Sequence, residues 1–88
     1  MMNQAILVGR LKEINNNTIT IEVTDTDGKK IKCFIDMSDT ILKNVREYVH
    51  HDDILGIRCK VGDQNTLIAD KVTFLSSRNN EEGEENDD

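Results

Sequence analysis

Apolar and polar residues alternate along several short segments of this chain, and a period of two is typical of β-strands that bury one face. Thr18–Thr24 shows the pattern most clearly, because isoleucine or valine occupies every second position. The Asp-Gly pair within Asp25–Lys30 then predicts a hairpin turn, and the chain returns along Ile31–Met37. The inner face of this return strand is predicted to hold Ile31, Cys33, Ile35 and Met37, and the outer face Lys32, Phe34 and Asp36.

Three further segments have strand character. They are Gln4–Leu11, Ile54–Val61 and Leu67–Leu75, and the last of them is predicted to bend near Asp70. The inward positions of the fourth strand are predicted to be Leu55, Ile57, Cys59 and Val61.

Between the third and fourth strands the period changes to that of an α-helix, with apolar residues on one stripe from Asp39 to His50. Ser38 and Asp39 are residue types that cap a helix N-terminus. Tyr48 lies on the apolar stripe, so we expect it in the core, as we do Phe74 of the fifth strand. Three strands, a helix and two strands is the order of the OB fold. The sequence therefore predicts an all-β protein, a five-stranded OB-fold barrel with one helix between strands three and four.

All hydrophobic residues lie within the first 75 of the 88 residues, and this predicts a domain boundary. We expect residues 1–76 to form one OB-fold domain and residues 77–88 to form a disordered acidic C-terminal tail. Residues 1–77 contain ten Lys/Arg and eleven Asp/Glu, whereas residues 78–88 contain one arginine and six acids. The predicted domain is thus almost neutral, without the basic excess that commonly marks a nucleic-acid-binding protein. A tail of this charge is usually a solvated extension, although it could also compete with phosphate for a basic groove.

Several runs resemble the bacterial single-stranded DNA-binding protein (SSB) family. The opening run Met2–Leu11, the helical run Asn44–Val49 continued by Asp53–Ile57, and the closing run Ala69–Leu75 are similar to that family in the same order. The resemblance covers about residues 2–76. It implies an OB fold, assembly into a homodimer or homotetramer, and sequence-tolerant binding of single-stranded DNA.

The chain also departs from that family. Its loops are short, since Asn15–Asn17 and Gly62–Asn65 stand where the family has longer connections. Lys30 and Asp36 occupy positions where the family places aromatic residues on the DNA-facing side of the third strand. The tail ends without the hydrophobic tip that docks partner proteins in the family, so we do not expect recruitment by that route.

Binding of single strands needs positive charge along the phosphates and flat faces on which bases stack. Phe34 is predicted to lie exposed beside lysines on the outer face of the third strand, with packing under a loop or in a subunit interface as open alternatives. The basic pairs could equally be ordinary surface charge. The candidate nucleic-acid-binding residues are Arg10, Lys12, Lys29, Lys30, Lys32, Phe34, Arg58 and Lys60.

We therefore expect sequence-tolerant single-stranded DNA binding in replication, recombination or repair, by a cytoplasmic homo-oligomer. The expected partners are single-stranded DNA, further copies of the same chain, and replication proteins. The alternative is an OB-fold protein-interaction (replication-accessory) module with little or no DNA binding. An RNA-binding OB domain is a third class.

Signals for catalysis, metals and membranes are absent from the sequence. It contains no triad order, metal-ligand spacing or phosphate loop, so we expect no enzymatic activity and no cofactor. His50 and His51 are adjacent and point in different directions, which makes a poor metal site. Cys33 and Cys59 lie in apolar strands and are expected to be buried free thiols. No segment approaches the roughly 18–20 apolar residues of a transmembrane helix.

Overall fold

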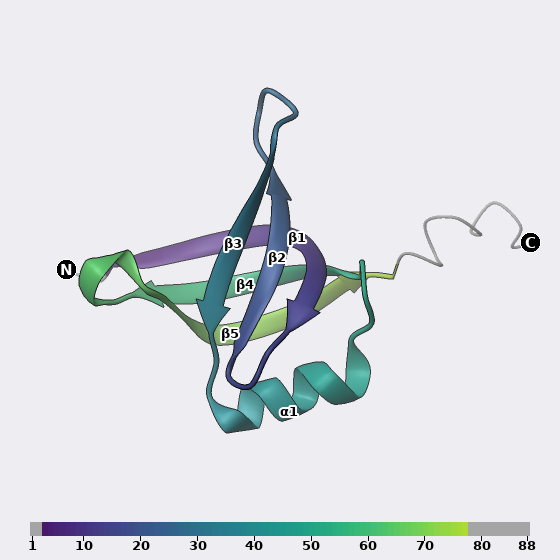
Figure 1. Ribbon diagram of the computed structural model, residues 1–88, viewed down its shortest axis with the longest axis vertical. Coiled ribbons are helices and arrows are strands. Elements are labelled where there is room, and N and C mark those ends of the chain that lie inside the picture. Colours follow the sequence, from purple (N-terminus) through teal and green to yellow (C-terminus); the bar gives the residue numbers. More distant parts are fainter. Residues whose placement is uncertain (1–2, 78–88) are drawn as a thin grey trace, which may run out of the picture.

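The computed structural model describes residues 3–77, which form five strands and one α-helix in the predicted order (Figure 1). The predicted tail therefore lies outside the described residues from position 78 onward. The elements are β1 (Gln4–Ile14), β2 (Thr18–Thr24), β3 (Lys30–Asp36), α1 (Asp39–Tyr48), β4 (Ile54–Val61) and β5 (Leu67–Ser76), with a short 3-10 turn at Asp63–Asn65. Hydrogen bonds join the strands in the order β1-β2-β3-β5-β4, and β4 pairs with β1, so that the ring closes.

β1 is long and bends around the barrel, so that it pairs with two neighbouring strands. Its first part, Gln4–Arg10, pairs with β4, and its last part, from Arg10 to Ile14, pairs with β2. Lys12 is an extra residue in the second pairing, and such a bulge bends a strand. At the crossing, a β-carbon added to Gly9 would lie 2.5 Å from the backbone oxygen of Glu22. Glycine is therefore required where β1 passes over β2.

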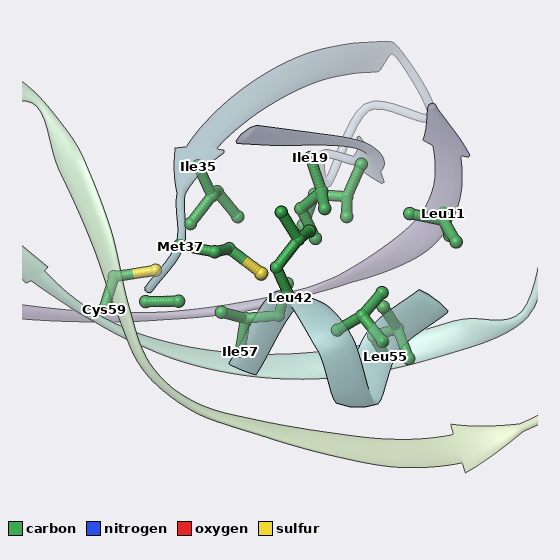
Figure 2. Close-up of a cluster of buried hydrophobic side chains, with 11 residues drawn as sticks. Leu11, Ile19, Ile35, Met37, Leu42, Leu55, Ile57 and Cys59 are labelled. Carbon is green, nitrogen blue, oxygen red and sulfur yellow. The ribbon is translucent and has the colours of Figure 1, made fainter. Parts of the chain in front are cut away.

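The core inside this ring is aliphatic. Figure 2 shows Met37, Leu42 and Ile57 pointing toward one another from β3's end, α1 and β4. No aromatic side chain belongs to the buried core of the described residues. The buried residues are Leu11, Ile19, Ile21, Ile35, Met37, Leu42, Val45, Leu55, Ile57, Cys59 and Ala69. The inward positions predicted for Leu55, Ile57 and Cys59 are confirmed, with each fully buried.

α1 closes one end of the barrel. The predicted cap forms, because Ser38 Oγ accepts a hydrogen bond from the Ile41 amide (3.3 Å), and Leu42 and Val45 are buried against the core. The helix ends at Tyr48, two residues before the predicted end at His50, since Val49 is extended (φ −114°, ψ 136°).

Two predicted core positions are wrong because β5 continues past the end of β3. β3 pairs with β5 only through Ile35 with Leu67 and Asp36 with Ile68, after which the chain leaves for α1. The inner side of the later part of β5 is therefore not covered by a strand. Phe74 is 49% exposed there, and Tyr48, in the last turn of α1, is 69% exposed.

The hairpin of β2 and β3 projects from the barrel (Figure 1). Ile35 and Met37 are buried at its base as predicted, whereas Ile31 near the tip is 45% exposed. Ile31 was predicted to be buried on the inner face, and this prediction is wrong. The tip of the hairpin extends beyond the core, so its inner side is exposed to solvent. The predicted bend in β5 is confirmed, since the register with β4 shifts at Asp70.

Candidate nucleic-acid interface

The outer side of the β2–β3 hairpin presents an aromatic ring between charged side chains. Register pairing places Phe34 opposite Thr20 and Lys32 opposite Glu22. Phe34 is 63% exposed, and Lys32 is exposed. We call the outer surface formed by Lys30, Lys32 and Phe34, together with Lys29 in the adjoining turn, the hairpin face.

The tip of the hairpin is held by one carboxylate. Asp25 Oδ1 accepts hydrogen bonds from the amides of Asp27 and Lys29, both at 2.9 Å, and the Gly28 amide donates to the Asp25 carbonyl at 3.0 Å. Gly28 has φ +83°, a left-handed conformation that glycine adopts without steric cost. The turn therefore fixes where Lys29 leaves the hairpin.

Thr20 lies next to the Phe34 ring and is almost fully buried. It is only 2% exposed although it lies on the outer side, with Phe34 as its partner in β3 and Glu13 as its partner in β1. Its Oγ1 has no hydrogen-bond partner among the described residues. The side chain next to Phe34 is thus buried, whereas the Phe34 ring itself is exposed to solvent.

The lysines of the hairpin face have no acidic partner. Within residues 3–77, none of the three, Lys29, Lys30 and Lys32, takes part in an ion pair. Lys32 lies directly across from Glu22, but no ion pair joins the two side chains. These three ammonium groups are therefore available to a phosphate.

Arg10 lies across Glu22 from Lys32, and Lys12 is the bulge residue two positions further along β1, but both side chains contact the loop after α1. Lys12 Nζ lies 2.7 Å from Asp52 Oδ1 and 4.0 Å from Glu22 Oε1, and Arg10 Nη1 donates to the Asp52 carbonyl at 3.0 Å. Two backbone hydrogen bonds join the same loop to Leu11. Both cations thus fasten this loop to β1, which reduces what they offer to a ligand.

Arg58 and Lys60 lie on a different part of the surface. Arg58 Nε and Nη2 both contact Asp70 Oδ2 at 3.1 Å. Lys60 faces Gln4, six residues along β1 from Arg10, or roughly 20 Å of strand. The structure therefore groups Lys29, Lys30, Lys32 and Phe34, places Arg10 and Lys12 beside them, and separates Arg58 and Lys60.

Sequence patterns did not reveal that the other two aromatic residues of the chain are also exposed. Tyr48 and Phe74 line a groove of about 510 Å³ between α1 and β5. Tyr48 sits on the apolar stripe of its helix and Phe74 on the inner side of its strand, so periodicity alone assigns both to the core. Their exposure depends on where β3 ends relative to β5, and no local pattern encodes this.

The two cysteines of the described residues are unlike reactive thiols. Burial, and to a lesser extent the Cys33 thiol, raise the pKa of the Cys59 thiol, so Cys59 stays protonated at neutral pH. Both cysteines are free thiols, with Cys59 buried as predicted and Cys33 half-buried. Residues 3–77 contain no group of three or more potential ligand side chains placed to hold a metal ion. No helix in this part of the chain is long and apolar enough to cross a membrane.

No protein-family model matches this chain, and no curated protein matches it in sequence. Among solved structures, the mitochondrial single-stranded DNA binding protein Rim1 of S. cerevisiae has a TM-score of 0.75 at 15% identity, over 88% of this chain and 98% of that chain. The N-terminal domain of PriB from Thermoanaerobacter tencongensis, solved as a dimer, has a TM-score of 0.67 at 16% identity, over 85% of this chain and 98% of that chain. The chain therefore has the fold of SSB-type OB-fold proteins, and the predicted OB fold is confirmed.

Proposed function

We propose that this protein binds single-stranded DNA, without sequence preference, through the hairpin face. The observation that carries the proposal is the exposure of Phe34 beside lysines that have no acidic partner within residues 3–77. An exposed ring next to unpaired cations supplies the two elements that single-strand binding needs, a stacking platform and a phosphate contact. The fold shared with Rim1, a single-stranded DNA-binding protein, supports the same function.

The mechanism is electrostatic capture followed by stacking. Lys29, Lys30 and Lys32 meet backbone phosphates and release counterions, and one base stacks on Phe34. Such a stack contributes on the order of 1–3 kcal/mol. Because the hairpin face has a single aromatic residue, we expect weak binding with a steep dependence on salt. Replication, recombination and repair are the processes that expose single strands for such a protein.

Self-association is part of the proposal and has its own surface, the outer side of β1, β4 and β5. Four aliphatic residues on this side are exposed, next to the charged Arg58 and Lys60 of β4, and exposed apolar patches commonly mark interfaces. The Leu75 side chain lies over Gly56, with its Cδ1 3.4 Å from where a β-carbon would stand, and Gly56 is the partner of Val8. The exposed set is Ile6 (73%), Val8 (51%), Ile68 (42%) and Leu75 (49%). A second copy covering this side would stabilise a domain whose core is small.

The free edge of β1 adds to this surface. Among residues 3–77, β4 is the one strand that pairs with β1 from Gln4 to Gly9, because the pairing with β2 begins at Arg10. An unpaired edge is a template for another strand. The PriB domain, which has the same fold, was solved as a dimer, and this supports self-association.

The alternative function is a protein-interaction module with little or no DNA binding, and the near-neutral charge of residues 1–77 favours it. Fluorescence anisotropy of labelled oligo-dT at low and moderate salt distinguishes the two. We expect binding at low salt that weakens steeply as salt is added. Absence of binding at low salt, by protein with native circular dichroism, would reject the DNA-binding proposal. A parallel titration with oligo-U tests preference for RNA.

A further inference from the structure

The groove between α1 and β5 combines an open strand edge with apolar side chains. β3 pairs with β5 only up to Ile68, whereas β5 continues to Ser76. Beyond Ile68, no strand of residues 3–77 pairs with β5 on the side opposite β4. This open edge of eight residues, Ala69–Ser76, is roughly 26 Å long. α1 runs alongside β5 and forms the facing wall (Figure 1).

The walls of this groove are mostly apolar and partly open to solvent. Phe74 and Tyr48 are 49% and 69% exposed, and Ile41, Val49 and Val72 are half-buried. Leaving two of the three aromatic side chains of the chain open to water forfeits hydrophobic stabilisation. A ligand that covers these two side chains would recover this hydrophobic stabilisation.

The charges of the groove select among occupants. Asp70 is neutralised by Arg58, whose Nε and Nη2 lie 3.1 Å from its Oδ2, so Lys71 is the remaining charge in the lining. One cation is too little for a nucleic-acid backbone, but it complements one acidic side chain. The chain's own segment 78–88 has acids but no apolar residue to place against Tyr48 and Phe74.

We propose that the α1–β5 groove binds an extended segment of a partner protein, which adds to β5 as a further strand in the place that β3 vacates at Met37. Main-chain hydrogen bonds to the open edge give affinity, as in other cases of strand addition, and alternate side chains give specificity. The segment carries apolar residues at every second position, against Phe74, Val72 and Tyr48, and an acidic residue near Lys71. This site is separate from the hairpin face, so the proposal does not depend on DNA binding.

Selection of peptides on the full chain tests this proposal. The probe is a displayed library of random peptides about twelve residues long, enough to span the open edge. We expect enriched sequences that alternate apolar and polar residues and include an acid. Their synthetic forms should lose affinity by about tenfold or more, corresponding to 1.4 kcal/mol, with Tyr48→Ser and with Phe74→Ser. Two variants are used so that loss of fold in one does not decide the result.

Matched controls separate the groove from other surfaces. Phe34→Ala removes an exposed aromatic residue elsewhere and should leave peptide affinity unchanged. N-methylation at alternate peptide residues should abolish binding in only one of its two registers, because only one set of amides faces β5. Tyr48→Ser should not change the affinity for oligo-dT.

Three results would overturn the proposal. They are a library that yields no enriched peptide, enriched peptides whose affinity ignores both Tyr48→Ser and Phe74→Ser, and tolerance of N-methylation in both registers. Loss of oligo-dT binding in Tyr48→Ser would instead assign the groove to nucleic acid and reject a peptide occupant.

Discussion

Phe34 exposes 63% of its surface, and this forfeits much of the roughly 1.5–3 kcal/mol that burial of such a side chain contributes. Burial in the core therefore gives no reason for a phenylalanine at this position. A base stacked on the ring would cover it, so binding accounts for what folding does not. Its cross-strand partner Thr20 is already buried, so the Phe34 ring is the exposed apolar surface of this pair.

Replacing Phe34 tests the stacking role at the scale of one side chain. We predict that Phe34→Ala lowers affinity for oligo-dT by roughly 5- to 150-fold, the equivalent of 1–3 kcal/mol. Phe34→Tyr keeps a ring and should stay close to the wild-type affinity. Anisotropy titrations at one salt concentration measure both. Equal affinities for Phe34→Ala and the wild type would remove the ring from the site.

Gly9 illustrates a residue whose role is purely structural. We predict that Gly9→Ala destabilises the fold by about 1–3 kcal/mol, the usual cost of overpacking, because the new methyl would meet the Glu22 backbone at 2.5 Å. Gly56→Ala is the matched control, since its methyl would meet only the flexible Leu75 side chain at 3.4 Å. Urea denaturation of the two variants gives the difference. Equal midpoints would mean that β1 does not cross β2 so closely.

At the scale of elements, the β2–β3 hairpin brings together charges that come from one turn and one strand. The Asp25 carboxylate orders the turn, and the alternation of β3 puts Lys30, Lys32 and Phe34 on one side. Lys12 of β1 pairs with Asp52, and Arg58 of β4 pairs with Asp70. Arg10 donates to the Asp52 carbonyl, and Lys60 lies opposite Gln4, at the far end of β1 from Arg10. The hairpin therefore provides most of the positive charge that is open to phosphate near Phe34.

The salt dependence of binding measures how many phosphates the hairpin contacts. The logarithm of the binding constant falls with the logarithm of salt concentration by about 0.7 per phosphate for single strands. We predict that the double variant Lys30→Ala and Lys32→Ala makes this slope shallower by about 1.4. The control, Lys43→Ala with Lys71→Ala, removes the same charge elsewhere. An equal change in both double variants would indicate a general charge effect, not a contact.

Local sequence patterns predicted which segments form strands and the helix, but they predicted less well how far each element extends past its neighbours. β2 and β4 have the predicted bounds, because their alternation is strict, and the Asp-Gly turn lies where expected. The exposure of Ile31, Tyr48 and Phe74 was not predictable in the same way. It depends on how far the hairpin and β5 extend past their neighbours, which is a property of register between distant strands.

The candidate site was predictable only in part for a similar reason. Phe34 and Lys32 are exposed on the outer side of β3 as predicted from its period. The contacts of Arg10 and Lys12 with Asp52 arise because the loop after α1 folds back on β1, more than 30 residues away in sequence. Such long-range ion pairs leave no periodic signal. The pairing of Arg58 with Asp70 across β4 and β5 is of the same kind.

At the scale of the whole molecule, the surface divides into three regions with different chemistry. The hairpin face is basic with one ring, the outer side of β1, β4 and β5 combines exposed aliphatic residues with Arg58 and Lys60, and the α1–β5 groove is apolar with an open edge. A barrel of this size buries a small core, so a second copy on the aliphatic side adds stability as well as binding sites. Linking two hairpin faces would raise the overall affinity for a long single strand.

The oligomeric state tests this division. We predict that the wild type sediments as a dimer or tetramer and that Ile6→Asp, a charge in the most exposed aliphatic position, sediments as a monomer. Ile31→Asp is the control, because Ile31 is also exposed but lies on the hairpin. Sedimentation equilibrium gives the masses. A monomeric wild type, or an oligomer that survives Ile6→Asp, would contradict self-association through this side.

Mapping the contact by amide chemical shifts as oligo-dT is added to the wild-type protein tests the proposed interface most directly. We predict that the perturbed amides cluster along residues 29–34 and their partners in β2, with smaller changes near Arg10 and Lys12. Perturbations centred on Tyr48 and Phe74, or on the outer side of β4, would place the DNA elsewhere and contradict the hairpin face as the nucleic-acid interface.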